Sequence, residues 1–507
     1  MKLTERSFGI PLLAGLCACV LLSCASEGIA AGEEEKVEVP DLPVGAVGVC
    51  SDTVAPSVPA PSRTFYVNAQ SGNDNATGTS PSTAWRTLNK ANSTAQPGDL
   101  FLLRGTFSNQ VIHPERSGTA SAKIVYREDP GATAILEGGQ YDVIVWLDEL
   151  SHVVVDGLEL RNAPNPVLMR YSGGHNWLRN LWIHDLGTNQ IMTSSDNRIE
   201  NSVIEGCGSE SANAGECIWI ADGAHRNVIA NNTIRNAGHG LVGVGGDKTS
   251  MSPSEDNRVV SNDLDNPWAS NVLIYGPGTR TVVECNKIHN TSTSGVNYAR
   301  TGIQINGVDN VVRYNEIFDN MSDGIQIQGY SFQGLMQNAT GNQIYHNTVY
   351  NNGGAGLEIV QKDGDVSNNV IQNNIFWGNN TLSQRTWGGE KWDIWIDLYN
   401  ANRVWPQGSL NGNVIRNNIM ASSAADAGKG WMLIVRSAGG NYQYTRAQAE
   451  STFSGVSANL ETNPLFVNAG SGDFLLQSGS PAIDAGLAIS GMSFLGPAPD
   501  LGAHEAR

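Results

Sequence analysis

Short apolar stretches alternate with asparagine along most of this chain. The motif Asn-x-apolar returns every 21 to 44 residues, at Asn180, Asn201, Asn232, Asn262, Asn286, Asn315, Asn347, Asn373 and Asn417. Repeats of this length without helical periodicity are typical of stacked β-coils, each too small to bury its own apolar face. Asparagine suits the bends, because it tolerates left-handed backbone and hydrogen-bonds an equivalent residue in the next coil. The pattern predicts an all-β chain folded as a right-handed parallel β-helix, a solenoid with Asn232, Asn262, Asn286, Asn315 and Asn347 at equivalent bends.

A second series of strands reads apolar-x-apolar, at 218–220, 272–274, 303–305, 325–327, 357–359 and 394–396. Alternation along a strand turns the flanking aliphatic residues inward and the middle residue outward. Because coils stack about 4.8 Å apart, the middle residues are predicted to form one surface column: Trp219, Leu273, Gln304, Gln326, Glu358 and Trp395. The last four are polar or aromatic, as expected of a groove that binds an extended polymer.

The two ends of the chain depart from the repeat. The predicted segments are a lipoprotein signal peptide (1–23), a flexible tether (24–62), the β-helix (63–460) and a C-terminal cap (461–507). Lys2 and Arg6 precede the apolar run 8–22, which is short for a membrane span. The run ends at Leu-Leu-Ser-Cys24, which resembles a bacterial lipoprotein processing box, so Cys24 is the predicted lipidated residue. The alternative is an ordinary secretory signal whose cysteines are incidental.

Several motifs outside the repeat resemble secreted bacterial parallel β-helix proteins, including calcium-dependent pectate lyases. They are an opening strand at 63–68, a Trp-x-Thr-Leu-x-Lys-Ala helix at 85–91, a Pro-Gly-Asp strand at 97–106, and a Ser-Pro-Ala-Ile-Asp-x-Gly tail at 480–486. The resemblance covers roughly 63–507. It implies a helix that caps the first coil against edge-to-edge pairing, a C-terminal capping segment, and a polysaccharide as the partner.

Composition limits the partners further. The 507 residues carry a net charge of −18, which argues against nucleic acid and also counts against an anionic polymer unless metal ions or a basic patch intervene. After the signal, Cys50, Cys207, Cys217 and Cys285 remain, without the CxxC spacing of zinc sites. Cys207 and Cys217 are close enough to bridge one coil, or they are free thiols in the core. A monomeric, extracytoplasmic protein held at the cell envelope by its lipid anchor is expected.

Candidate lyase residues gather at the C-terminal end of the column. A polysaccharide lyase needs a base that removes the proton next to a uronate carboxyl, and a cation that neutralises that carboxylate. Glu-Ile-Val-Gln-Lys362 resembles the Glu…Lys strand of chondroitinase B and alginate lyases, in which lysine is the base, although the spacing is one residue shorter and the neighbouring serines are missing. Lys362 is therefore a candidate base beside Glu358, or a solvated turn lysine. Asp363 and Asp365 are candidate calcium ligands, or plain surface carboxylates. The paired-aspartate turn of the pectate lyases has a single counterpart here, Asp323.

Glycoside hydrolysis is the competing chemistry. Asp393 and Asp397 lie four strand residues apart, roughly 13 Å, which is too far for a catalytic carboxylate pair, whereas Asp393 with Glu358 is nearer to the ~5–9.5 Å required. Six of the twelve tryptophans lie between Trp377 and Trp431, where they either stack on sugar rings or fill the junction with an insertion. The third interpretation is a non-catalytic glycan-binding or surface-structural protein, which would need only Trp219, Gln304, Gln326 and Trp395. Asp397 is a further candidate for substrate binding.

Overall fold

The computed structural model describes residues 56–139, 143–186, 190–192, 194–208, 215–245, 252–292, 300–332, 335–381, 393–398, 409–421, 433–437 and 440–506. They belong to one compact unit, Val39–Arg507. The predicted signal peptide, Cys24 and most of the predicted tether lie outside the described residues. No helix within the described ranges is long and apolar enough to cross a membrane.

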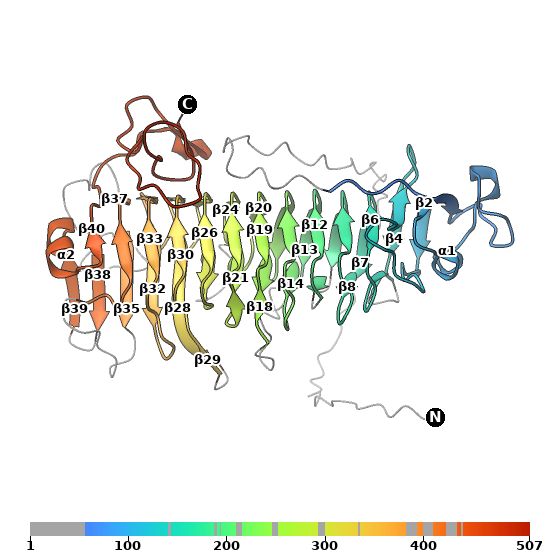
Figure 1. Ribbon diagram of the computed structural model, residues 1–507, viewed down its shortest axis with the longest axis horizontal. Coiled ribbons are helices and arrows are strands. Elements are labelled where there is room, and N and C mark those ends of the chain that lie inside the picture. Colours follow the sequence, from blue (N-terminus) through green and yellow to red (C-terminus); the bar gives the residue numbers. More distant parts are fainter. Residues whose placement is uncertain are drawn as a thin grey trace, which may run out of the picture. The chain divides into compact units, whose positions relative to one another are not determined.

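The N-terminal end is covered by a short helix, as predicted. β1 (Arg63–Asn68) pairs with β2 (Asp99–Ser108), and η2 (Pro81–Thr83) and α1 (Leu88–Thr94) lie between them in sequence. α1 begins three residues later than the sequence motif, because the Thr87 side chain accepts a hydrogen bond from the backbone N–H of Lys90 and so forms the N-cap. Leu88 and Ala91 are fully buried in the solenoid core, so α1 seals the first coil (Figure 1).

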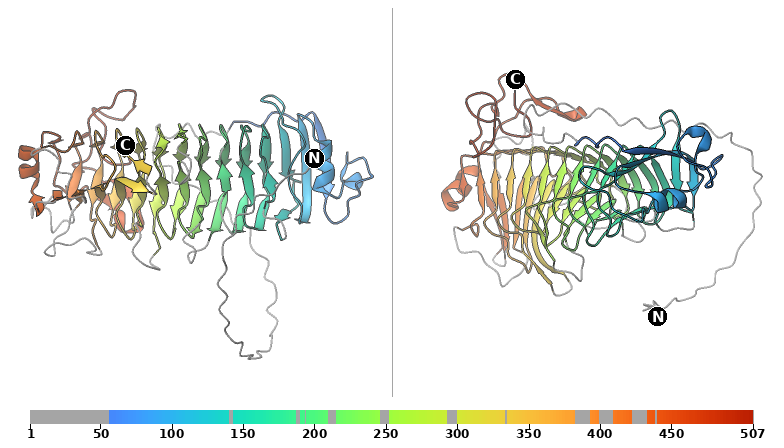
Figure 2. Two further views of the ribbon diagram at one scale, coloured as in Figure 1. Left: turned by 90° about the horizontal axis from the view of Figure 1, so that it is seen from below. Right: turned by 45° about the vertical axis from the view of Figure 1, so that its right-hand side comes forward.

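Each regular coil contributes one strand to each of three sheets, which lie side by side along the solenoid (Figures 1 and 2). After β1 and β2, the first sheet contains β3 (Ile124–Glu128), β6 (Val153–Asp156), β9 (Trp177–Arg179), β12 (Arg198–Glu200), β15 (Val228–Ala230), β19 (Arg258–Val260), β23 (Val282–Glu284), β26 (Val311–Arg313), β30 (Gln343–Tyr345), β33 (Val370–Gln372), β36 (Val414–Arg416) and β40 (Val456–Ser457). β2 pairs with β3 through its first half and with β4 through its second half, so it passes from the first sheet into the second.

The second sheet continues with β4 (Ala134–Glu137), β7 (Glu159–Ala163), β10 (Trp182–Leu186), β13 (Val203–Cys207), β16 (Thr233–Ala237), β20 (Asp263–Asp265), β24 (Lys287–His289), β27 (Glu316–Phe318), β31 (Thr348–Tyr350), β34 (Ile375–Trp377) and β37 (Ile419–Ala421). The third sheet contains β5 (Val145–Trp146), β8 (Val167–Met169), β11 (Gln190–Met192), β14 (Ile218–Ile220), β17 (Val242–Val244), β21 (Val272–Ile274), β25 (Ile303–Ile305), β28 (Ile325–Phe332), β32 (Leu357–Gln361), β35 (Ile394–Leu398) and β38 (Leu433–Ser437). Strands of successive coils pair in parallel, which confirms the predicted β-helix.

Short elements outside the three rows are β18 (Ser254–Glu255), β22 (Gly278–Thr279), β29 (Leu335–Gln337), β39 (Gly440–Tyr444), α2 (Arg446–Thr452), β41 (Phe466–Asn468), η4 (Ala469–Ser471) and β42 (Asp473–Leu476). β29 and β39 pair antiparallel with β28 and β38. α2 lies beside β39 and β40 at the C-terminal end of the solenoid (Figure 1).

The predicted asparagine ladder is confirmed for Asn232, Asn262, Asn286, Asn315 and Asn347. Each Nδ2 donates to Oδ1 of the next member at 2.9–3.0 Å. The backbone N–H of each member donates to the same oxygen. The ladder continues through Asn374, Asn418 and Asn459, and the Glu450 carboxylate of α2 accepts the backbone N–H of Asn459 at 3.1 Å. All of these asparagine side chains are buried, so the ladder satisfies backbone groups that water does not reach.

Four asparagines were assigned to the ladder incorrectly. Asn180, Asn201, Asn373 and Asn417 instead occupy the left-handed bend one residue earlier, with φ between 50° and 58°. At two of these coils the ladder position is taken by Asn374 and Asn418, and at another Ser202 accepts the bond from Leu181. Both positions of the bend favour asparagine, because one needs left-handed backbone and the other needs an amide.

Two further ladders are present that the repeat analysis missed. One precedes the first-sheet strands and includes Asn197, Asn227 and Asn257, then Asn310, Asn342, Asn369 and Asn413. The other follows the second-sheet strands and runs from Asn320 through Asn352 to Asn379. The coils are therefore held together at three corners.

The segment 461–507 folds back along the solenoid instead of covering its last coil. Phe466 and Phe474, on β41 and β42, pack with Phe318 and Trp377 of the second sheet. Further along, His504 contacts Glu316 at 2.5 Å. The predicted cap thus covers a flank of the later coils, and α2 and β39 border the end.

Candidate functional site

The predicted column is in register on the third sheet. Gln304 pairs with Gln326, Gln326 with Glu358, and Glu358 with Trp395. At the other end, Trp219 pairs with Gly243, which precedes Leu273 and Gln304. The sequence motif did not include Gly243, because the middle residue of Val242–Val244 carries no side chain.

The C-terminal part of the column is not an open surface. The flanking aliphatic residues point into the core as predicted, but Gln326 and Trp395 are only 3% exposed and Glu358 is 1% exposed. Trp219 and Gln304 are partly exposed. Alternation establishes that a side chain points away from the solenoid core; it does not establish that solvent reaches it.

Some side chains of the column are hydrogen-bonded to one another or to a neighbouring residue. Nε2 of Gln326 donates to Oε2 of Glu358 at 2.5 Å, and Nε2 of Gln304 donates to Asn306 at 3.0 Å. Within the described part of the chain, Oε1 of Gln326 and Nε1 of Trp395 have no hydrogen-bond partner. Leaving such a group unpaired costs about 1–3 kcal/mol. An acceptor and a donor on either side of Glu358 are thus open to a ligand or water.

The other candidate residues lie at different distances from Glu358. The register puts Asp393 beside Gly356 and Asp397 beside Val360, and the Cα atom of each aspartate is about 8 Å from that of Glu358. Lys362 follows Glu358 by four residues, which is about 13 Å along the strand direction. Lys362 and Asp393 are about 20 Å apart on the same reasoning, so they do not flank one bond. Oδ1 of Asp393 accepts from Asn379 at 3.4 Å, where the third ladder ends. Asp393 therefore accepts a hydrogen bond at the end of this ladder. Asp397 is the carboxylate on the outer strand face beside Glu358.

The residues proposed for calcium fit that ion poorly. Both Asp365 oxygens accept hydrogen bonds within the chain, from Ser367 at 2.7 Å and from Asn411 at 3.1 Å, and Asp363 is exposed on the turn. Calcium takes six to eight oxygen ligands. Among the described residues, no group of three or more His, Cys, Asp or Glu side chains is placed to hold a metal.

The tryptophan-rich region falls mostly outside the described residues, including Trp387, Trp392, Trp405 and Trp431. Trp377 is 8% exposed and packs in the cluster under the C-terminal segment. For this tryptophan the packing interpretation is the one that the contacts support.

A constellation at the N-terminal end of the column was missed by the sequence analysis. Oε1 of Glu216 contacts Nδ1 of His239 at 2.9 Å and accepts from the Tyr275 hydroxyl at 3.2 Å. The Tyr275 ring packs edge-on against Trp219 with 5.2 Å between centroids. Burial, followed by the charge of Glu216, raises the pKa of Tyr275 well above its usual value, so the phenol stays protonated. Glu216, His239 and Tyr275 follow one another at intervals of 23 and 36 residues and lie outside the repeated motifs, and only coil stacking brings them together.

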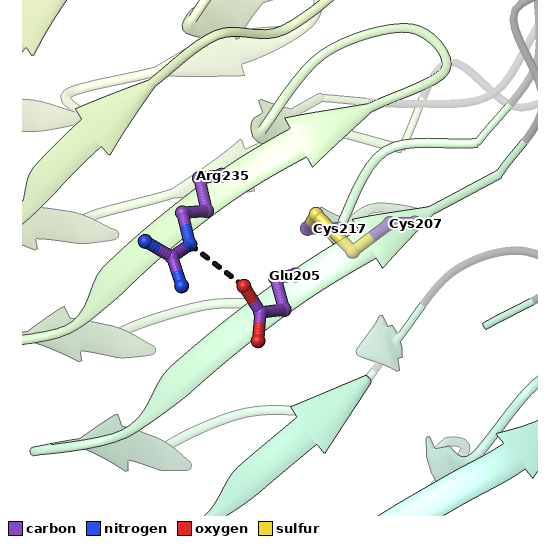
Figure 3. The surroundings of a disulfide bond; sticks show 4 residues. All are labelled: Glu205, Cys207, Cys217 and Arg235. Carbon is purple, nitrogen blue, oxygen red and sulfur yellow. Dashed lines mark hydrogen bonds and ion pairs between the residues drawn. A yellow bond between two sulfur atoms is a disulfide. The ribbon is translucent and has the colours of Figure 1, made fainter. Parts of the chain in front are cut away.

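A disulfide fixes the segment that carries Glu216. Cys207, at the end of β13, is bonded to Cys217 with 5.1 Å between Cα atoms, and Glu205 of the same strand pairs with Arg235 of β16 at 2.7 Å (Figure 3). Cys285 is also disulfide-bonded. Of the two alternatives left by the sequence, the bridge is the correct one. Disulfides persist in oxidising compartments.

No family model and no curated protein matches this chain. Among solved structures, the chain is similar to the pectate lyase Pel9A, with a TM-score of 0.51 and 17% identity over 89% of this chain and 98% of that one. An alginate lyase from Paenibacillus sp. str. FPU-7 has a TM-score of 0.39 and 24% identity over 60% of this chain and 94% of that one. A GH136 lacto-N-biosidase from Eubacterium ramulus has a TM-score of 0.47 and 15% identity over 70% of this chain and 67% of that one. The chain therefore shares the parallel β-helix fold of pectate lyase Pel9A.

Proposed function

We propose that this protein is an extracytoplasmic enzyme that binds a polysaccharide along the outer face of its third sheet and cleaves it by β-elimination. One observation carries the proposal: Gln326, Glu358 and Trp395 form an in-register column in which a buried acceptor and a buried donor are without partners among the described residues. Sugar hydroxyls supply both a donor and an acceptor, and the partly exposed Trp219 of the same column offers an indole face on which a sugar ring can stack. The likeness to a pectate lyase fold is consistent with such a substrate.

β-Elimination suits a uronate-containing glycan. A base removes the proton on the carbon next to the carboxyl, the electron pair of that C–H bond forms a carbon–carbon double bond, and the bond to the neighbouring sugar oxygen breaks. The departing oxygen then takes up a proton. In the C-terminal part of the column, Lys362 is the proposed base, and Gln304, Gln326 and Trp395 hold the sugars.

Hydrolysis is the second candidate, because Glu358 and Asp397 project from neighbouring strands about 8 Å apart between Cα atoms. Carboxylates ~5–9.5 Å apart serve as acid and base, or as acid and nucleophile, in glycosidases. In this case Glu358 and Asp397 carry the reaction and Lys362 is dispensable.

The proposed location is the outside of the cytoplasmic membrane. The Cys207–Cys217 disulfide supports an oxidising compartment. Lipidation of Cys24 remains part of the proposal, with the segment 25–62 as the tether that lets the β-helix reach its substrate. The membrane partner is then the lipid bilayer, reached through the anchor alone.

The test is turnover of purified protein on a panel of uronic and neutral glycans, with unsaturated-product absorbance and reducing ends measured together. As a lyase, the wild type produces both signals, and Lys362→Ala abolishes them while glycan affinity is retained. As a hydrolase, it produces reducing ends alone, and Glu358→Gln abolishes them. Lys287→Ala, on the second sheet, is the matched lysine control and is expected to behave as wild type. Glycan binding that is lost in Trp395→Ala, without any product, would contradict an enzymatic function.

A further inference from the structure

We infer that His239, held by Glu216 and Tyr275, is a proton-transfer centre that acts on a uronate-containing glycan stacked on Trp219. This inference rests on the proposed function and assigns the reacting bond to a different end of the same sheet face. Trp219 precedes Glu358 by five strands, from β14 to β32, about 24 Å along the column at ~4.8 Å per coil. The two ends are therefore separate candidates that one experiment can distinguish.

The centre is assembled from three successive coils. Glu216 lies two residues before β14, His239 lies three residues before β17, and Tyr275 directly follows β21. One carboxylate oxygen, Oε1 of Glu216, receives both contacts, at 2.9 Å from Nδ1 of His239 and at 3.2 Å from the Tyr275 hydroxyl. A carboxylate only accepts, so Nδ1 carries the hydrogen and Nε2 is left as the basic nitrogen of the neutral ring.

The exposed fractions of the Glu216 and His239 side chains differ in the way that proton transfer requires. The Glu216 side chain is 11% exposed and the His239 side chain is 22% exposed, so the carboxylate is shielded while the imidazole reaches solvent. A shielded carboxylate fixes the orientation and the tautomer of the imidazole, as in other carboxylate–histidine pairs. The protonated Tyr275 phenol donates a second bond to Glu216 and adds no charge. Tyr330, whose pKa is raised by burial, is the other titratable group that acts on Tyr275.

Gly243 leaves room for the Trp219 indole beside Glu216 and His239. A Cβ at Gly243 would lie 2.5 Å from the Trp219 ring and 3.3 Å from Cγ of Glu216. The absent side chain therefore lets the Trp219 indole lie across the next coil, next to the carboxylate. The Cys207–Cys217 disulfide holds the residue adjacent to Glu216 in the chain. Both features fix Trp219 and Glu216 relative to each other.

The proposed step is balanced within the site. Nε2 of His239 takes the proton from the carbon next to the sugar carboxyl, the C–H electron pair becomes the new double bond, and the bond to the departing sugar oxygen breaks. The imidazolium then returns its proton to that oxygen, so the enzyme ends in its starting state and no co-reactant is consumed. His239 is the catalytic residue, and Glu216 and Tyr275 are positioning residues.

The experiment compares His239→Gln with Lys362→Ala on any glycan that the wild type degrades. His239→Gln is expected to lower kcat by about 10²–10⁴-fold with little change in KM, and Lys362→Ala is the competing variant, because only one of the two residues can be the base of a given step. His225→Gln, at a first-sheet turn, is the matched histidine control and should leave kcat unchanged. Circular dichroism and thermal unfolding establish that each variant is folded.

Glu216→Gln tests the positioning role and is nearly isosteric, so it also serves if His239→Gln does not fold. Removal of the carboxylate acceptor beside His239 should lower kcat with little change in KM, and nitrogen NMR should show that the neutral ring is no longer held in the Nδ1-protonated form. A loss of activity without such a change of tautomer would indicate a structural role only. Nitrogen NMR of the wild type should show His239 protonated at Nδ1 in the neutral ring.

The outcomes separate the two hypotheses. Wild-type kcat in His239→Gln, with turnover abolished in Lys362→Ala, overturns this inference and leaves the proposed function intact. Loss of turnover in His239→Gln alone supports the inference and removes Lys362 as the base. A wild type that degrades none of the glycans overturns both.

Discussion

Asn286 offers the sharpest test of how the solenoid is held together. Its Oδ1 accepts from the backbone N–H and from Nδ2 of Asn262, and its Nδ2 donates to the Val259 carbonyl and to Asn315. Asn286→Ala removes these four bonds at a site that is 1% exposed. The backbone N–H of Asn262 and the Val259 carbonyl each lose a buried bond, at about 1–3 kcal/mol each. The expected loss of unfolding free energy is about 2–6 kcal/mol.

The measurement is urea denaturation followed by far-UV circular dichroism, with Asn75→Ala as the control. Asn75 is exposed, and its substitution should change stability by no more than about 0.5 kcal/mol. The two variants remove the same side chain, so the difference between them isolates the ladder. Equal midpoints for the two variants would refute the reasoning, because the ladder amides would then contribute nothing beyond an exposed asparagine.

Three further predictions concern the anchor, the disulfide and the response to acid. Cys24→Ala should release folded protein from the membrane fraction, and unchanged fractionation would contradict lipidation. Replacing Cys207 and Cys217 together with serine should lower the unfolding free energy by about 2–3 kcal/mol, from the short loop that the bridge closes, as measured by urea denaturation under non-reducing conditions. Burial lowers the pKa of His346 to about 4, so the unfolded chain binds this proton first as the pH falls from about 6.5 to 4, and stability falls with it. His346→Asn, which suits the left-handed backbone there, should lose about 3 kcal/mol less stability than wild type between pH 7 and pH 4.

The repeat could be predicted from sequence because the Asn-x-apolar motif is local, so each coil carries its own copy. Asn-x-apolar was enough to align Asn232, Asn262, Asn286, Asn315 and Asn347. It failed at Asn373 and Asn417, where an Asn-Asn pair offers two equally suitable residues and only the backbone angle decides which one bends. The ladder through Asn227 and Asn257 was missed because the Asn-x-apolar motif marks the asparagine that follows each first-sheet strand, whereas these asparagines precede it.

The candidate site was predictable only where it follows strand alternation. Two regularities predict the register of the column: side chains alternate between the two faces of each strand, and successive coils are equally spaced. They align Gln304, Gln326, Glu358 and Trp395. Neither regularity predicts the burial of these side chains, because it depends on what packs outside the sheet. Glu216, His239 and Tyr275 lie at strand ends in turns of different length, so no spacing in the sequence relates them.

The ladders have a direction. In each one the amide N–H of an earlier coil points to the oxygen of the next, so the side-chain dipoles add head to tail and leave a partial positive charge at the C-terminal end. A carboxylate stands at that end in two cases, Glu450 beside Asn459 and Asp393 beside Asn379. These charges complement the aligned dipoles and occupy the acceptor position that an additional coil would otherwise fill. Asp393→Asn would supply an amide there in place of a charge, and the stack would gain a donor that faces onward, toward whatever coil or chain comes next.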